Sequence, residues 1–333
     1  MTRFFVVALV LALAWSFVAP TARSADSGHP LVLERTIALP DVSGRIDHMA
    51  VDLHRNRLFV AELGNDSVDV IDLASGALLH RFDGLKAPQG VAYAPGPDAI
   101  IVANADDGSV HFYRGRDFAD LGILNLGDDA DNARLDRRNG HVVIGYGNGA
   151  LAVIDPGSRS KLQDIKLLGH PESFQIDPRA NRAYVNVPDA GQIAVIDLAA
   201  GRQVAKWTVP GLAENFPMAI DDSGVTIATV FRSPARLVFL DSGTGAVTGS
   251  YSTCADAGDM FFDARRYRVY VSCGAGTVDV FSRNGTDTRH VASVETSSGA
   301  RTSLYVPELG ELYVAKRAGL LANAAILLFH PAP

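Results

Sequence analysis

Short stretches of alternating apolar and polar residues recur along most of the chain, separated by turns rich in Gly, Asn and Asp. In residues 56–76 (NRLFVAELGNDSVDVIDLASG), two alternating segments flank such a turn, a pattern typical of a β-hairpin. Equivalent hairpins are expected at 98–114, 140–158, 181–201, 224–245, 267–285 and 310–330. The pattern therefore predicts an all-β protein.

The hairpins are evenly spaced, which indicates a tandem repeat. The last residue of the first strand in each hairpin recurs every 41–43 residues, at Val60, Val102, Ile144, Val185, Ala228, Val271 and Val314. A further strand precedes each hairpin, as in MAVD (49–52), and a weaker one follows it, as in ALLHRFDG (77–84). Four short strands per ~40–45 residues are typical of a β-propeller, whose blades bury one another's faces. We predict seven four-stranded blades.

The two ends of the repeat region are expected to complete one blade together. The seventh repeat ends after its third strand, near Phe329, whereas an additional strand at 31–39 (LVLERTIAL) precedes the first repeat. We predict that this strand is the outer strand of the seventh blade, which closes the ring and pairs an exposed edge. Residues 318–328 have helical propensity, but the repeat register favours a strand after a longer loop. A single propeller domain is expected over 31–333.

The N-terminal residues have the pattern of a secretory signal peptide. Arg3 precedes an apolar run over 4–19, shorter than the ~20 residues of a membrane-spanning helix, and Ala22-x-Ser24 fits a cleavage site. We predict a cleaved signal peptide over 1–24 and a periplasmic or secreted protein; a retained N-terminal anchor is the alternative. No later stretch is apolar enough to span a membrane, and a monomer is expected.

The repeats resemble those of the YVTN β-propeller family, the extracytoplasmic propellers related to YncE. The resemblance is carried by AYVNVPDAGQIAVIDLAAG (183–201), LFVAELGNDSVDVIDLASGA (58–77) and PQGVAYAP (88–95), and it covers roughly 31–333. Repeats 2 and 5 depart from the Val-Ile-Asp ending of the family phrase. These motifs are hairpin turns and core strands, so the resemblance implies a rigid secreted propeller and identifies no catalytic residue.

Polar residues gather at positions that should surround one mouth of the central channel. In a propeller, the connections between blades and the turns between second and third strands lie on the same face. The candidate ligand-binding residues at these positions are Asp47, His48, Glu62, Asn104, Asp131, Asn132, Glu172, Arg232, Arg301 and Lys316. Acidic residues and a histidine come mainly from repeats 1, 3 and 4 and basic residues from repeats 5 and 7, so we expect opposite charges across the channel.

These residues allow two kinds of site. Asp47, His48, Asp131 and Glu172 have donor types that bind a divalent cation. Arginines opposite them could hold an anionic ligand through paired hydrogen bonds. A bound metal beside such a clamp, with His48 as a candidate catalytic base, would suit a lactonase- or lyase-like enzyme. The simpler alternative is that the polar residues satisfy turn N–H groups and pair with one another.

The two cysteines are both expected on the mouth face. Cys254 falls in the connection between repeats 5 and 6, and Cys273 falls in a turn of repeat 6. In a secreted protein, two such cysteines usually form a disulfide, which requires a Cα separation of about 4.4–6.8 Å. The alternative is a soft-metal site that also uses His48 or Asp259.

The composition narrows the function without identifying a ligand. The 333-residue chain carries a formal net charge of −7, which argues against nucleic-acid binding despite a local group of basic residues. The first-ranked function is therefore a binding or scaffold protein. It would receive a small molecule, metal ion or protein partner at the channel mouth. A metal-assisted enzyme is the alternative, and single-stranded nucleic-acid binding comes third.

Overall fold

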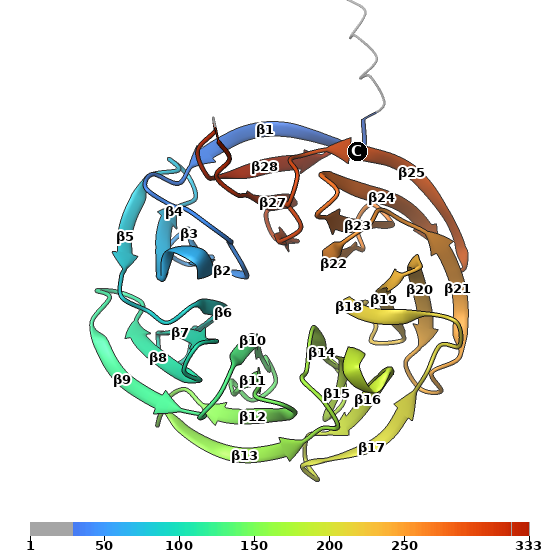
Figure 1. Cartoon of the computed structure of the whole chain (residues 1–333), viewed down its shortest axis with the longest axis horizontal. Coiled ribbons are helices and arrows are strands. Elements are labelled where there is room, and N and C mark those ends of the chain that lie inside the picture. Colours follow the sequence, from blue (N-terminus) through green and yellow to red (C-terminus); the bar gives the residue numbers. More distant parts are fainter. Residues whose placement is uncertain (1–28, 321, 333) are drawn as a thin grey trace, which may run out of the picture.

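Seven four-stranded antiparallel sheets form a ring around a central axis in the computed structural model (Figure 1). The structure describes residues 29–320 and 322–332. The predicted fold class, a seven-bladed β-propeller, is confirmed. The predicted signal peptide over 1–24 lies outside the described residues. Within the described ranges, no helix has the length and apolarity that crossing a membrane requires.

Each blade follows the chain from its inner strand A to its outer strand D, except that blade 7 takes its outer strand from the other end of the chain. Blades 1 to 3 contain β2 (Met49–Asp52), β3 (Arg57–Glu62), β4 (Ser67–Asp72), β5 (Leu78–Phe82); β6 (Pro88–Ala94), β7 (Ala99–Asn104), β8 (Ser109–Arg114), β9 (Asp120–Asn125); and β10 (Ala130–Leu135), β11 (Val142–Tyr146), β12 (Ala150–Asp155), β13 (Ser160–Lys166). Blades 4 to 6 contain β14 (Phe174–Ile176), β15 (Arg182–Val187), β16 (Gln192–Asp197), β17 (Arg202–Trp207); β18 (Ala213–Ile220), β19 (Thr226–Ser233), β20 (Ala235–Asp241), β21 (Val247–Ser252); and β22 (Ala257–Asp263), β23 (Arg268–Cys273), β24 (Thr277–Asn284), β25 (Asp287–Glu295). Short 3-10 turns, η1 (Leu63–Asn65) and η2 (Pro188–Ala190), follow β3 and β15.

Blade 7 joins the two ends of the described chain. It contains β26 (Ser303–Val306), β27 (Glu311–Lys316), β28 (Ala325–Pro331) and β1 (Leu31–Ala38). β1 pairs with β28 from Leu31 opposite Pro331 to Ala38 opposite Ala325, and Figure 1 shows these blue and red strands side by side. The predicted closure is therefore confirmed, and β28 is a strand, as the repeat register favoured.

The core is divided among the interfaces between blades. Seven clusters of buried apolar side chains each combine residues from two adjacent blades, so every neighbouring pair in the ring shares one. Leu58 of blade 1 packs with Tyr313 of blade 7, and Phe112 of blade 2 packs with Ile144 of blade 3. Full burial of such a side chain contributes about 1.5–3 kcal/mol. These interfaces hold the inner strands rigidly around the channel.

Candidate functional site

A cavity of about 300 Å³ at one mouth of the channel is lined by residues from all seven blades. Each blade supplies the residue at one repeat position, just before or at the start of its inner strand: Asp47, Gln89, Asp131, Glu172, Phe216, Gly258 and Arg301. The next repeat position adds His48, Asn132, Ser173, Asp259 and Thr302. The ring therefore gathers residues far apart in the sequence into one cavity.

Two backbone devices place these side chains. In blades 2, 3, 5 and 6 the lining residues lie at a β-bulge of the inner strand, whereas in blades 1, 4 and 7 they precede that strand. A bulge interrupts the ladder and redirects side chains, which is common beside binding sites. Glycine allows close contact between blades: a Cβ on Gly90 would lie 2.0 Å from the carbonyl oxygen of Asp131, and one on Gly258 would lie 2.6 Å from that of Arg301.

The structure brings seven of the ten candidate residues together. Asp47, His48, Asp131, Asn132, Glu172, Arg232 and Arg301 line the mouth cavity. Glu62, Asn104 and Lys316 do not line it. These three end the B strands β3, β7 and β27, which are second from the axis.

The polar groups of Glu62 and Asn104 serve their own hairpin turns instead. The Glu62 side chain is buried and accepts a hydrogen bond from the hydroxyl of Ser67. The Asn104 amide donates to the carbonyl and hydroxyl oxygens of Ser109, both at 3.1 Å. The expectation that all the B-to-C turns would contribute to the mouth was therefore too broad. Arg232 reaches the cavity because it lies two residues further along its own hairpin than the equivalent of Glu62.

Two histidines flank the carboxylate of Asp131 on the acidic side of the cavity. His48 Nε2 lies 3.9 Å from Asp131 Oδ1 and 3.8 Å from Asp47 Oδ1. His170 Nε2 lies 3.7 Å from Asp131 Oδ2, and its Nδ1 donates to the carbonyl oxygen of Gly147 at 2.7 Å. Blades 1, 3 and 4 thus meet through this carboxylate.

The pKa values of the two histidines shift in opposite directions. Burial, aided by the positive charge of Arg134, lowers the pKa of His48 to about 4. Burial also opposes the charged form of His170, but the ion pair with Asp131 and the hydrogen bond to the Gly147 carbonyl outweigh it and raise the pKa to about 9. At neutral pH, a neutral imidazole and an imidazolium therefore flank the same carboxylate.

Four other cavity carboxyl groups, those of Asp47, Asp129, Glu172 and Asp259, have pKa values that burial raises. Burial raises the pKa of Asp47 to about 7 although Arg45 Nη2 lies 2.5 Å from its Oδ2. Burial likewise raises the pKa of Asp259 to about 7, although its Oδ2 accepts a hydrogen bond from the backbone N–H of Ser303 at 2.8 Å. The pKa of Glu172 is also raised by burial. The charge of the cavity therefore changes near neutral pH.

The arginine side is organised around the segment after Cys254. Arg232 donates from Nε and Nη2 to the carbonyl oxygen of Ala257 at 2.9 and 2.6 Å, and its guanidinium carbon lies 3.6 Å from the centre of the Phe216 ring. Arg301 Nη1 donates to Asp256 Oδ1 at 2.6 Å, and Arg232 Nη2 lies 3.5 Å from the same oxygen. Two guanidinium groups therefore converge on one carboxylate at the rim.

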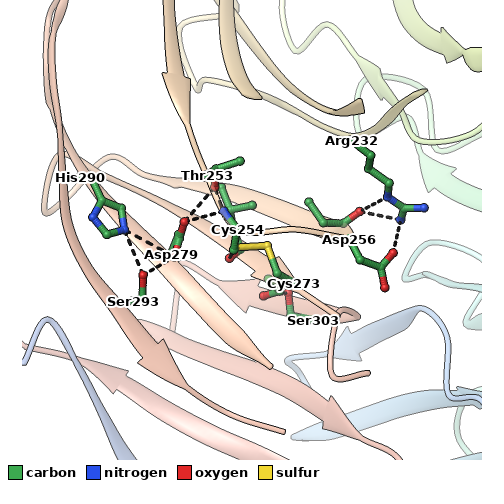
Figure 2. The surroundings of a disulfide bond; sticks show 12 residues. Arg232, Thr253, Cys254, Asp256, Cys273, Asp279, His290, Ser293 and Ser303 are labelled. Atoms are coloured by element: carbon green, nitrogen blue, oxygen red, sulfur yellow. Dashed lines mark hydrogen bonds and ion pairs between the residues drawn. A yellow bond between two sulfur atoms is a disulfide. The ribbon is translucent and has the colours of Figure 1, made fainter. Parts of the chain in front are cut away.

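A disulfide fixes this segment. Cys254 and Cys273 are bonded, with a Cα separation of 6.0 Å, so the expected pairing is present. Asp279 Oδ2 also accepts a hydrogen bond from the Cys254 backbone N–H at 2.8 Å. Figure 2 shows the bond between these contacts and the Asp256–Arg232 pair, two residues along the chain. The disulfide therefore anchors the carboxylate that orients both mouth arginines.

The described residues do not form a ready-made metal site. None of their groups of three or more His, Cys, Asp or Glu side chains has an arrangement that could hold a metal ion. The four hypothesised donors, Asp47, His48, Asp131 and Glu172, do line one cavity. Asp47, His48 and Asp131 take part in the ion pairs described above, whereas no ion pair within the described chain reaches Glu172.

Ten residues that line the cavity were not among the candidate ligand-binding residues, and those with charged or aromatic side chains are Arg45, Asp129, His170, Phe216 and Asp259. Phe216 and Asp259 occupy the repeat positions of Asp47 and His48, so the repeat register contained that signal. Arg45, Asp129 and His170 lie two residues before Asp47, Asp131 and Glu172. A third aligned position, two residues earlier, would have found them.

Comparisons with known proteins show the fold and no closer relationship. No family model matches the sequence, and a search of curated proteins found no significant match. Among solved structures, the chain is similar to one from Kuenenia stuttgartiensis hydrazine synthase, with 16% identity and a TM-score of 0.74, over 83% of this chain and 94% of that chain. It is also similar to a chain of a mitotic checkpoint complex, with 13% identity and a TM-score of 0.79, over 97% and 99% of the two chains. At these identities, the likeness establishes a seven-bladed β-propeller and nothing about its ligand.

Proposed function

We propose that this propeller is an extracytoplasmic binding protein that holds a small polar molecule in the mouth cavity. The observation that carries the proposal is the gathering of side chains from all seven blades, with both signs of charge, around one cavity of about 300 Å³. That volume is at the lower end of the roughly 300–1,000 Å³ typical of ligand sites, which favours a small ligand.

The proposed location has two supports. The N-terminal sequence has the pattern of a secretory signal, and its apolar run is short for a membrane span. The pairing of Cys254 with Cys273 suits an oxidising compartment, where such bonds persist. The resemblance of the repeats to the YVTN family is consistent with both.

A binding experiment tests the proposal. The mature chain is screened by thermal shift against a library of small polar molecules, and hits are measured by calorimetry on wild type, Arg232→Gln and Arg202→Gln. Arg202 begins the exposed outer strand β17 and is the matched control. We expect at least one 1:1 ligand that Arg232→Gln weakens about tenfold or more, while Arg202→Gln leaves it unchanged. A library without hits, or hits that bind Arg232→Gln equally well, would contradict a mouth site.

A second candidate function, a hydrolase or lyase, is favoured by one observation. His48 shares the cavity with the mouth arginines, and its pKa of about 4 leaves the imidazole unprotonated and weakly basic at neutral pH. Its Nε2 is 3.8–3.9 Å from the nearest carboxylates among the described residues, which is beyond hydrogen-bond distance. Turnover across a panel of lactones that His48→Gln abolishes would favour this function over binding alone.

A further inference from the structure

Polar groups on the acidic side of the mouth cavity lack partners. Among the described residues, no hydrogen bond or ion pair reaches the Glu172 carboxylate, which lines the cavity. Asn132 is only 3% exposed and also lines the cavity, and its Oδ1 has no hydrogen-bond partner there. Acceptors in a protein wall are normally satisfied, so the unpaired carboxylate of the half-buried Glu172 indicates a place for a donor in the cavity, and the unsatisfied Asn132 Oδ1 shows that this side of the wall is short of donors.

Donor groups on the arginine side are also left over. Arg232 uses Nε and Nη2 on Ala257 and Asp256, and within the described chain no partner reaches its Nη1. Arg301 uses Nη1 on Asp256, and its other nitrogens lack a partner in the same part of the chain. Since a guanidinium presents five N–H donors, both arginines retain donors suited to a planar anion.

The two sets of groups face one cavity without neutralising each other. The positive charge of Arg232 acts to lower the pKa of Glu172, so each is within the other's field, yet no ion pair joins them. A purely anionic ligand at the arginines would meet repulsion from Glu172 and Asp131, and a purely cationic one would meet repulsion from Arg232 and Arg301. A molecule that carries both charges avoids both penalties.

We infer that the ligand of this cavity is a small zwitterion, an inference that rests on the proposed binding function. Its ammonium group donates to the Glu172 carboxylate, and its carboxylate accepts from Arg232 and Arg301. Charge-assisted hydrogen bonds of these types are about twice as strong as neutral ones, which suits a site with few apolar contacts. Phe216 is the aromatic part of the wall, beside Arg232.

Matched probes test the inference by removing one charge at a time. The probes are the proteinogenic α-amino acids, β-alanine and γ-aminobutyrate, each with its N-acetyl and methyl ester derivatives, measured by calorimetry on the full mature chain. We expect at least one underivatised amino acid, the parent compound, to bind. Its N-acetyl and methyl ester derivatives should each bind at least about tenfold more weakly. An N-acetyl or ester form that binds as tightly as its parent would overturn the inference.

Variants locate each charge. In Glu172→Gln the parent compound should bind about tenfold more weakly, and its advantage over the N-acetyl derivative should fall to about onefold, because the ammonium has lost its partner. In Arg232→Gln, the advantage over the ester should shrink in the same way. Glu308→Gln is the control, because Glu308 is exposed in the turn after β26. If the affinity ratios of the parent to its N-acetyl and ester derivatives persist in both cavity variants, the charges bind elsewhere and the inference is overturned.

The outcome also separates this inference from the proposed function. If none of the zwitterions binds at about 10 mM, but a neutral or singly charged library compound binds and requires Arg232, the ligand class is wrong and the binding function stands. If no compound of either set binds in a manner that depends on the cavity, both are wrong.

Discussion

The two ends of the inner strands both carry carboxylates, but only one end leaves them unsatisfied. At the end away from the mouth, Asp52 accepts from the backbone N–H of His54 at 3.0 Å and from the Arg55 guanidinium at 2.9 Å. At the mouth end, Glu172 has no partner among the described residues, and burial holds the pKa of Asp259 near 7. The same strands therefore begin at the mouth cavity and end in turns whose carboxylates are hydrogen-bonded.

The cavities at the two ends differ in the same way. The mouth cavity, of about 300 Å³, is lined mostly by charged and amide side chains. A cavity of about 700 Å³ on the opposite face is lined largely by apolar groups, which include Val51, Leu53, Tyr93, Leu135, Leu304 and Val306. Backbone geometry explains the contrast. At the mouth, β-bulges and inter-blade connections direct polar side chains into the cavity. At the other end, regular turns bind the polar side chains as caps for their own N–H groups. Predictions that alter one end and leave the other intact test this contrast.

The largest effect is expected from removal of the disulfide, a cross-link present at the mouth end. Cys254→Ala with Cys273→Ala should lower the free energy of unfolding by about 3 kcal/mol, given the separation of 19 residues. Hydrogen exchange should quicken in residues 255–258 and stay unchanged in the turn that carries Asp52. Denaturant unfolding and exchange mass spectrometry measure the two effects. Equal loosening of both ends would contradict a local anchoring role.

The next largest effect concerns the carboxylate between the histidines. Asp131→Asn should lower the free energy of unfolding by about 2 kcal/mol at pH 7, since it leaves His170 with a weaker buried partner. The pKa of His170 is raised from 6.5 to about 9 in the folded protein, so its stabilisation is complete below about pH 6.5 and is lost as pH rises through about 9. The wild-type advantage should therefore shrink progressively between about pH 6.5 and pH 9. Urea unfolding across this range, with an NMR titration of His170, checks the prediction.

The sequence predicted the ring and much of its mouth because periodicity fixes both. A strand repeated every 41–43 residues must occupy equivalent places in a ring, so residues aligned with Asp47 face one cavity whatever their chemistry. The same logic gave the closure by residues 31–39. These inferences needed strand order alone, which tandem repeats encode directly.

The residues that were misplaced depend on geometry that the repeat does not encode. Glu62, Asn104 and Lys316 end B strands, and whether such a residue reaches the channel depends on the pleat and on the turn that follows. Arg232 shows that a shift of two residues along a hairpin decides whether a side chain reaches the cavity. Arg232 lines the cavity, whereas the residue of its hairpin equivalent to Glu62 stays in the blade. The repeat register could have placed His170 at the mouth, but its pairing with Asp131 of the neighbouring blade depends on three-dimensional geometry.

A carboxylate at the opposite end should behave as a structural cap. Asp136→Ala should lower the free energy of unfolding by about 1–2 kcal/mol at pH 7, because Asp136 accepts from the backbone N–H of Arg138 at 3.0 Å and from its guanidinium at 2.7 Å. Burial opposes ionisation, but these bonds keep the pKa of Asp136 below its usual value. Its contribution is therefore present above about pH 4 and is lost as pH falls further. Mouth ligand affinity should not change, which calorimetry with any ligand found for the wild type would show.

The smallest effect, and the one opposite in sign, is expected at Asp259 in the mouth. Its folded-state pKa is raised from 3.8 to about 7 by burial, so ionisation costs stability that the folded protein loses as pH rises from about 4 through 7. Asp259→Asn removes that charge and leaves an amide oxygen able to accept from the Ser303 backbone N–H. Relative to wild type, the variant should therefore gain about 1 kcal/mol between about pH 5 and pH 8, whereas Asp136→Asn should gain nothing over the same interval. Parallel urea unfolding of the two variants makes the comparison directly. Equal pH dependence at both positions would mean that the mouth carboxylates are as well satisfied as the caps at the other end, and would remove the contrast on which the ligand site rests.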